Sequence, residues 1–132
     1  MNSPSDDIKD RLVSITSLGL TFASNLFIGR EPATPANVAT IYDTPGYGAA
    51  KSYLNDIQYE RPSVQIRVRN VSYPAGWALI NDIMQQLHNT SFTIGGAFYT
   101  AVFCSQLPAL LDWQGDNARF VATFDLHRRI SA

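Results

Sequence analysis

Apolar residues recur along the chain with two spacings, one typical of helices and one typical of strands. Ile8, Leu12 and Ile15 follow the i, i+4, i+7 spacing of an amphipathic helix. Pro4 suits the first turn of such a helix and Gly19 suits its end, so a helix is predicted over residues 4–18. A second helix is predicted to begin at Pro74, with a buried stripe of Trp77, Ile80, Ile83, Met84 and Leu87.

Strict alternation of apolar and polar residues predicts strands over residues 63–70 and 119–129. The inward positions are Val64, Ile66 and Val68 in the first and Phe120, Ala122, Phe124 and Leu126 in the second. Shorter strands are predicted at residues 26–28, 38–42 and 92–94, and another at residues 99–106 and 109–113 that is broken by Pro108; a turn is predicted at residues 95–96. The order α-β-β-β-α-β-β-β favours a single α+β domain, a mainly antiparallel sheet packed with two α-helices.

Residues 43–60 follow neither spacing. The segment contains the turn-forming residues Pro45, Gly46 and Gly48, and apolar positions recur in it without a regular interval. It is therefore predicted to be a long exposed loop, and loops of this length in compact domains are usually functional.

Composition narrows the class of protein. The 132 residues include 10 Lys and Arg against 11 Asp and Glu, and only 16% are charged while 45% are hydrophobic. The composition excludes an intrinsically disordered chain, which would have lower hydrophobicity and higher net charge. It also argues against a dedicated nucleic-acid binder, which usually has an excess of basic residues. A surface with so few charges is suited to association with other protein copies.

Compartment signals point to synthesis in the cytoplasm. Cys104 is the only cysteine, so an intrachain disulfide is excluded. The polar, acidic N-terminus is unlike a signal peptide, and the most apolar stretch, residues 18–28, is shorter than the ~20 residues that a membrane-spanning helix needs. We therefore expect no membrane partner.

Candidate catalytic and metal-binding residues are few. Lys51 and Ser52 end a segment similar to a phosphate loop, but Ala50 and Pro45 stand where that loop needs glycine. His88 and His127 lack nearby metal-ligating partners in sequence, and Cys104 lies in an apolar strand. We predict no catalytic residue, no metal and no cofactor, and expect a protein that is not an enzyme, although carboxylates could still meet in space.

Arginines are the remaining candidates. Arg67 and Arg69 share one face of a strand, and Arg119 and Arg129 share a face of another. These faces are either solvated or meet another subunit, because arginine is enriched at interfaces. Residues 1–60 carry a net charge of −3 and residues 61–132 carry +2, which favours head-to-tail association. The candidate interface residues are Arg67, Arg69, Arg119, Arg129, Asp43, Asp56 and Glu60.

Three segments carry a resemblance to a known family. They are Asn25-Leu26-Phe27-Ile28-Gly29-Arg30-Glu31-Pro32, Ile41-Tyr42-Asp43-Thr44-Pro45-Gly46 and Glu60-Arg61-Pro62-Ser63-Val64-Gln65-Ile66-Arg67-Val68-Arg69. Together they resemble the tail terminator, or tail-completion (minor capsid), proteins of long-tailed phages. In that family a helix, a Pro-x-x-Pro segment, a Tyr-Asp strand and a Pro-x-Val-Gln-x-x-Val-Arg strand follow one another. The resemblance covers roughly residues 4–95.

The resemblance implies a structural virion protein at the head-proximal end of the tail. Such proteins form rings, usually hexameric, that cap the tail tube, end its polymerisation and provide the surface for head joining. The implied partners are other copies of the chain, the tail tube protein and a head-completion or neck protein, while DNA passes through the lumen without specific binding. The alternatives are a head-completion or neck connector protein and a small α+β enzyme.

Overall fold

The computed structural model describes residues 2–51 and 57–131, which form two α-helices, a short 3-10 helix and six strands. The helices are α1 (Pro4–Ser14) and α2 (Tyr73–Leu87), and the 3-10 helix η1 spans Thr16–Leu18. The strands are β1 (Leu26–Ile28), β2 (Val38–Lys51), β3 (Ile57–Asn70), β4 (Thr90–Ile94), β5 (Ala97–Gln114) and β6 (Asn117–Ser131). The order of elements is the one predicted from the sequence.

All six strands belong to one sheet with the order β1-β2-β3-β6-β5-β4. The prediction of a single α+β domain with two helices is confirmed, but the sheet is mixed, because β1 runs parallel to β2 while the other neighbours are antiparallel. Residues 29–37 carry the chain back to the start of β2, so the two parallel strands are joined by a return segment and not by a tight hairpin, which joins antiparallel strands.

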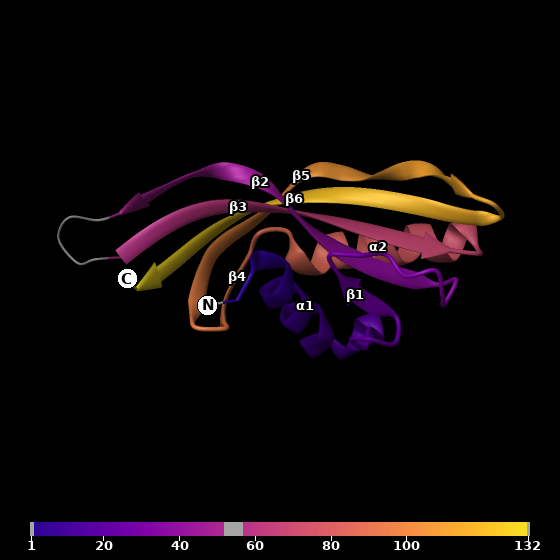
Figure 1. Ribbon diagram of the computed structural model, residues 1–132, viewed down its shortest axis with the longest axis horizontal. Helices are drawn as coiled ribbons and strands as arrows, with labels where there is room; N and C mark the ends of the chain where they lie inside the picture. Colours follow the sequence, from indigo (N-terminus) through magenta and orange to yellow (C-terminus); the bar gives the residue numbers. More distant parts are fainter. Residues whose placement is uncertain (1, 52–56, 132) are drawn as a thin grey trace.

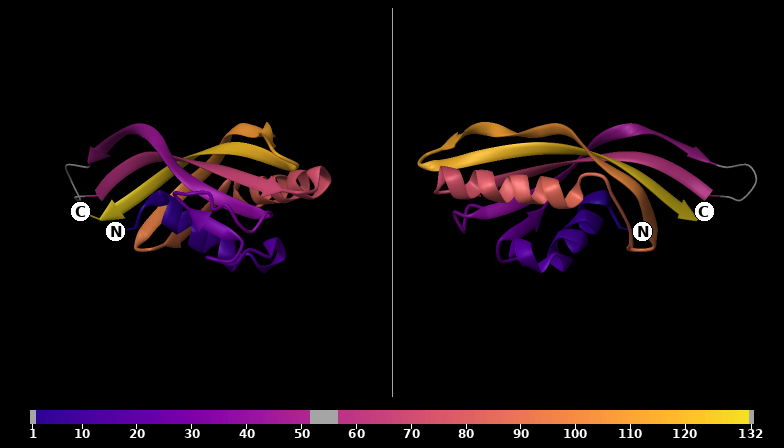
Figure 2. Two further views of the ribbon diagram at one scale, coloured as in Figure 1. Left: turned by 45° about the vertical axis from the view of Figure 1, so that its right-hand side comes forward. Right: turned by 180° about the vertical axis from the view of Figure 1, so that it is seen from behind.

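The two helices cover one face of the long, curled sheet and leave the other face open (Figures 1 and 2). Val64, Ile66 and Val68 of β3 face these helices and are fully buried, opposite Phe124, Ala122 and Phe120 of β6. The alternation predicted for both strands is therefore confirmed. Ile8 and Leu12 of α1 and Ile80, Ile83 and Leu87 of α2 complete the core.

Both helices begin where the sequence predicts, but they differ from it in detail. Ser3 caps α1 by accepting a hydrogen bond from the backbone N–H of Asp6. The helix ends at Ser14, before the predicted end at residue 18, because Ile15 has an extended backbone. The 3-10 helix η1 then continues the chain to Gly19. On α2 the sequence wrongly predicts a buried Trp77, which is 41% exposed. Gly76 takes the inward position, since the helix approaches Phe120 too closely for a side chain.

The predicted loop over residues 43–60 is wrong for its described part, because β2 extends to residue 51 and β3 begins at residue 57. Residues 52–56 of that loop lie outside the described residues. The register shifts between Thr44 and Tyr47 and again between Tyr47 and Ala50, so bulges break the alternation that would have indicated a strand. Gly46 lies against the backbone of Arg61, where a Cβ would come within 2.1 Å of the carbonyl oxygen.

Strand β5 also continues through a predicted break. Pro108 lies between Gln106 and Ala109, where the register with β6 shifts, so a bulge accommodates the proline inside one long strand. Strand β4 pairs with β5 only over residues 97–102. In the described part of the chain, β5 is therefore an edge strand from Phe103 onward.

Candidate assembly surfaces

Arg69 lies near one end of the sheet and is only 3% exposed, although the sequence places it on an outward strand face. Its Nη2 donates hydrogen bonds to the carbonyl oxygens of Pro32 and Pro35, both at 2.7 Å, and its Nε donates to that of Ala36 at 3.1 Å. A single guanidinium therefore fixes the proline-rich segment before β2 to the sheet. Arg69 serves the fold of its own subunit.

Arg119 lies beside Arg69 and shares a carboxylate with it. Glu31 accepts a hydrogen bond from Nη2 of Arg119 at 2.8 Å and forms an ion pair with Nη1 of Arg69 at 3.4 Å. Arg119 also donates to both carboxylate oxygens of Asp112, at 2.9 and 2.7 Å. The hydrogen bond to Glu31, with that to Asp112, raises the pKa of Arg119 above its usual value.

A second buried polar cluster lies near the other end of β6. The hydroxyl of Tyr99 donates to Oδ2 of the fully buried Asp7 at 2.6 Å, and Arg128 donates through Nε to Glu60 at 2.8 Å and through Nη1 to the carbonyl of Asn2 at 3.1 Å. Burial, with the hydrogen bond to Asp7, raises the pKa of Tyr99. The cluster connects the N-terminal helix to the sheet.

The sequence analysis missed Arg128 and Tyr99, although the pattern of β6 contained a signal for Arg128. This arginine lies two residues after Leu126 and continues the inward series. Glu60, a candidate interface residue, therefore forms an ion pair with Arg128 on the core side of its own sheet.

The other candidate residues lie apart from one another. Arg67 is half-buried with its guanidinium 4.9 Å from the ring centre of Tyr42, and the exposed Arg129 lies 5.0 Å from that of Phe98. Asp43 accepts hydrogen bonds from the backbone N–H and the hydroxyl of Ser5, at 2.9 and 2.7 Å. Asp56 lies outside the described residues. Opposite charges of the two chain halves thus pair within one copy, at Glu31–Arg119 and Glu60–Arg128.

The histidines and the cysteine have structural surroundings. Nδ1 of His88 accepts a hydrogen bond from the backbone N–H of Cys104 at 3.0 Å, and burial raises the pKa of the Cys104 thiol. Within residues 2–51 and 57–131, no group of three His, Cys, Asp or Glu side chains is placed to hold a metal ion. Of the helices that the structure describes, none is long and apolar enough to span a membrane.

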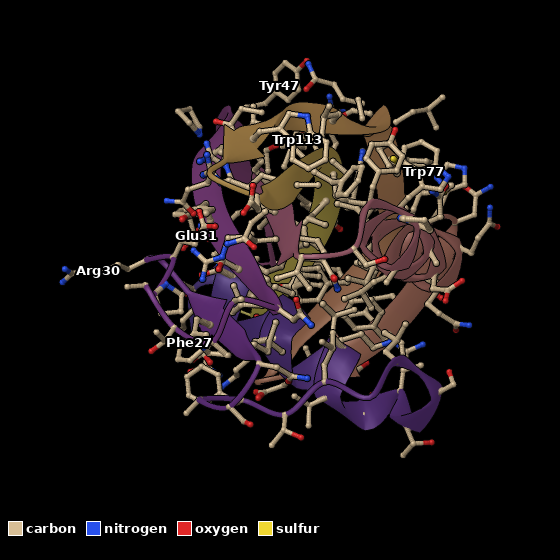
Figure 3. All side chains as sticks on the ribbon, turned by 90° about the vertical axis from the view of Figure 1, so that its right-hand side faces the viewer. Phe27, Arg30, Glu31, Tyr47, Trp77 and Trp113 are labelled. Atoms are coloured by element: carbon tan, nitrogen blue, oxygen red, sulfur yellow. The ribbon has the colours of Figure 1, made fainter. Side chains whose placement is uncertain are left out.

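Large apolar side chains are exposed on α2 and on the part of β5 that lies beyond its pairing with β4. We call this set the apolar strip; it comprises Tyr73, Trp77, Leu107, Leu110, Leu111 and Trp113, which are 41–72% exposed. Tyr73 stacks on Trp113 with ring centres 6.3 Å apart, so the helix and the strand contribute to one surface. Figure 3 views the molecule from the end where Trp77 and Trp113 lie, and shows Arg30 projecting from the body.

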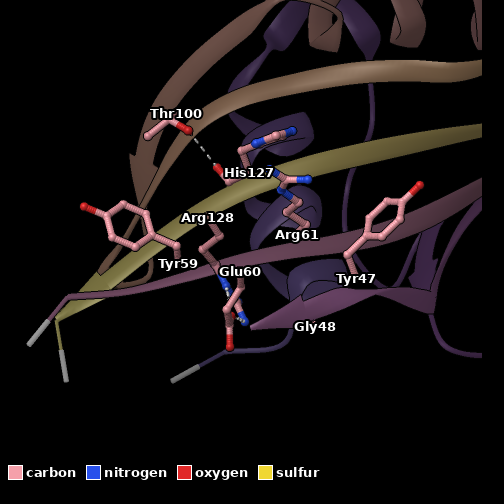
Figure 4. Close-up of a pocket in the computed structure, with 8 residues that line it drawn as sticks. All are labelled: Tyr47, Gly48, Tyr59, Glu60, Arg61, Thr100, His127 and Arg128. Carbon is pink, nitrogen blue, oxygen red and sulfur yellow. Dashed lines mark hydrogen bonds and ion pairs between the residues drawn. The ribbon is translucent and has the colours of Figure 1, made fainter. Parts of the chain in front are cut away.

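The open face of the sheet contains a hollow of about 330 Å³ near the opposite end. We call it the Tyr groove; its lining residues are Tyr47, Gly48, Tyr59, Glu60, Arg61, Thr100, His127 and Arg128. Figure 4 shows the rings of Tyr47 and Tyr59 on either side of Arg61. Tyr47 is 72% exposed, so the groove offers aromatic surface and a cation to a binding partner.

Comparisons with known proteins agree with the resemblance found in the sequence. A model of the family described as "Bacteriophage tail terminator protein" matches residues 9–129, which include the C-terminal strands. A chain of the solved structure titled "Virion of native gene transfer agent (GTA) particle" superposes with a TM-score of 0.62, covers 96% of this chain and 95% of its own, and is 8% identical. At that identity the likeness establishes the fold. No curated protein sequence gives a significant match.

Proposed function

Because the chain belongs to the bacteriophage tail terminator family, we propose that it forms a ring that caps the head-proximal end of the phage tail tube. The ring ends polymerisation of the tube and provides the surface for head joining. Family membership and the virion neighbour support a structural protein of the tail; the ring, its hexameric form and its place next to the head are our proposal.

The apolar strip is the observation that carries this proposal. Of the twelve large apolar side chains that are exposed among the described residues, seven lie on α2 or β5. Protein interfaces are enriched in Trp, Tyr and other large side chains of this kind. The strip therefore supports a chain whose final environment includes other protein subunits.

The polar clusters support an architectural role. Arg69, Arg119 and Arg128 each donate hydrogen bonds to carbonyl or carboxylate oxygens of the same chain. A catalytic site needs a group that is free to meet a substrate in a pocket. These arginines instead stabilise the ends of the sheet on which the exposed surfaces lie.

The proposal is tested by combining the purified protein with a tail tube protein encoded in the same genome. We expect native mass spectrometry to show closed rings, and electron microscopy to show tubes that stop growing and have additional density at one end. Tubes that grow without limit in excess of the protein would refute the capping role. Binding to portal or neck proteins without binding to tubes would favour the head-completion alternative instead.

A further inference from the structure

The small net charge of the chain averages over two faces of opposite sign. Helices α1 and α2, which cover one face of the sheet, carry four carboxylates against two cations, a net charge of −2 (Figures 1 and 2). On the open face, the outward positions of β3 between residues 57 and 67 and of β6 between residues 121 and 131 carry three arginines and one carboxylate. They are Arg61, Arg67, Arg129 and Asp125. A composition without a basic excess is therefore compatible with a locally cationic surface.

Aromatic rings hold two of these arginines in place. The guanidinium of Arg67 lies 4.9 Å from the ring centre of Tyr42, and that of Arg129 lies 5.0 Å from the ring centre of Phe98. A ring orients a guanidinium without neutralising it, and a guanidinium stacked in this way still has planar donors for an external anion.

Arg61 has similar surroundings at the Tyr groove, where the rings of Tyr47 and Tyr59 lie on either side of it (Figure 4). Within residues 2–51 and 57–131, none of the three open-face arginines forms an ion pair, whereas the internal arginines each pair with a carboxylate of the same chain. The charge of all three is therefore available to an anion from outside the molecule.

The three arginines form a line along the sheet. Arg129 is the register partner of Tyr59, and Arg61 and Arg67 follow on β3 itself, so the line spans eight residues of that strand. At about 3.3 Å per residue, its length along the strand is roughly 26 Å. Each strand of B-DNA carries a phosphate about every 3.4 Å along the helix axis. A continuous row of phosphates can therefore meet all three arginines, whereas the carboxylates of a protein partner would have to match each position individually.

We propose that the open face binds the phosphate backbone of duplex DNA, without reading its sequence, through Arg61, Arg67 and Arg129. This contact goes beyond the proposed function, which concerns protein partners. Phosphate contacts position a protein on DNA but carry no sequence information. The helix side has the same sign of charge as DNA, so the segregation of charge also determines which face meets the duplex.

The salt dependence of binding tests the number of contacts. Fluorescence anisotropy of a labelled, mixed-sequence DNA duplex measures the affinity, and sedimentation of the same samples gives the number of subunits bound. Each phosphate contact lowers the affinity roughly 3.5-fold between about 50 and 200 mM salt. Three contacts therefore predict a loss of roughly 40-fold per bound subunit over this range. Affinity that does not change with salt would overturn the proposal.

Single variants test the residues. Arg61→Gln, Arg67→Gln and Arg129→Gln each remove one contact, so we expect the loss between the two salt concentrations to fall to roughly 12-fold for each. Arg30→Gln changes the charge equally at an exposed position after β1 (Figure 3) and should keep the salt dependence of the wild type. Circular dichroism and thermal unfolding verify that each variant is folded. The same salt dependence in all four variants would contradict the assignment.

Removing a carboxylate tests the face from the opposite direction. Asp125→Asn removes the carboxylate that lies on the same face as the arginines, and we expect it to raise the affinity for the duplex at least about twofold at low salt. Asp82→Asn, at an exposed position of α2, is the matched control and should leave the affinity unchanged. Equal gains from both variants would show that DNA responds only to net charge, and the open face would not be the site.

The class of ligand is tested with two competitors, a single strand of the same DNA sequence and a poly-glutamate chain with the same number of charges. We expect the duplex to bind most tightly at equal salt. Poly-glutamate that binds as tightly as the duplex would make the face a site for an acidic protein and refute the proposal. A single strand that binds more tightly than the duplex, and that loses this advantage in Tyr47→Ala, would replace backbone contacts with base stacking.

The outcome is separable from the proposed function. If the wild type limits tube length but binds the duplex no better than its arginine variants, DNA binding by this face is refuted and the proposed function stands. If the wild type binds the duplex as expected but neither forms rings nor limits tube length, the proposed function fails and the DNA contact stands.

Discussion

At the scale of single residues, arginine is the main structural side chain of this protein. A guanidinium carries five donors in a fixed plane, which is why Arg69 can satisfy several carbonyl oxygens at once. A lysine at position 69 has one compact ammonium group and would leave some of these carbonyl oxygens without a hydrogen-bond donor. Buried carbonyl oxygens that lose their donors cost free energy, because water cannot replace the lost bond.

We therefore predict that Arg69→Ala lowers the free energy of unfolding by about 3 kcal/mol. The measurement is urea denaturation followed by circular dichroism. Arg67→Ala on the same strand is the matched control. Its half-buried guanidinium lies over the ring of Tyr42 and donates to the side-chain oxygen of Gln65, so its loss should cost less than about 1 kcal/mol. Equal losses for the two variants would contradict the role assigned to Arg69.

The buried Tyr99 predicts a pH dependence. An unfolded tyrosine ionises near pH 10, whereas burial and the hydrogen bond to Asp7 raise the pKa of Tyr99 in the folded state. Above pH 10 the unfolded chain loses this proton first, so the free energy of unfolding falls by up to about 1.4 kcal/mol per pH unit. Tyr99→Phe should remove this decline between pH 10 and 11, while Tyr47→Phe at an exposed position should keep it.

The burial of a side chain can be predicted from the sequence only where the residues that cover it follow from the local pattern of the chain. The alternation in β6 correctly predicts that Phe120 and Phe124 face the core, since a strand alternates by itself. Arg69 follows the same rule and points away from the core, yet it is buried. The reason is that residues 32–36, more than thirty positions earlier in the chain, fold over it. Periodicity contains no information about that contact.

At the scale of elements, the fit between α2 and β6 depends on a glycine in the helix. A Cβ on Gly76 would lie 2.7 Å from Cε2 of Phe120 and 3.1 Å from Cβ of Asn70. Alanine normally favours a helix over glycine by about 1 kcal/mol, so the observed glycine indicates that packing outweighs propensity. The helix can lie this close to the strand only without a side chain there.

Gly76→Ala is accordingly expected to destabilise the protein by about 1–3 kcal/mol, opposite in sign to its effect in an isolated helix. Thermal and urea unfolding provide the measurement. Gln85→Ala, at an exposed position of the same helix, should change stability by less than about 0.5 kcal/mol. A stabilised Gly76→Ala variant would show that the helix can move away from Phe120 at little cost.

Predictions at this scale succeed for regular elements and fail at bulges. The helix starts follow from Pro4 and Pro74, and the strand core of β3 follows from its alternation of apolar and polar residues. The extension of β2 past Pro45 was not predictable in the same way, because each bulge shifts the alternation by one residue and imitates a loop. Whether such a segment pairs depends on β3, which lies beyond it in sequence.

At the scale of the whole molecule, the centre of the sheet joins distant parts of the chain. Strand β3 pairs with β6, and their partner residues Ile66 and Ala122 are separated by helix α2 and two further strands. Folding must close this long loop before the central pairing contributes, which is slow in proteins dominated by non-local contacts. We expect refolding from urea to take milliseconds to seconds in stopped-flow fluorescence, and a sub-millisecond main phase would contradict this.

In the folded molecule, charges from the two halves of the sequence pair with each other. The −3 and +2 halves of the sequence lie side by side in one sheet, so Glu31 and Glu60 form ion pairs with arginines of the same copy. Opposite net charge in the two halves of a chain therefore does not by itself predict a contact between subunits. Only the exposed charges remain available for one.

The position of strand β6 in the sheet determines how the protein resists a pulling force. This strand is hydrogen-bonded to β3 on one side and to β5 on the other along most of its length, and it ends near the N-terminal residues, to which Arg128 connects it. A pulling force on the C-terminus along the strand loads both ladders in shear, so many bonds must break together instead of one after another. Strand β6 is thus a strong point of attachment for a force applied along its length.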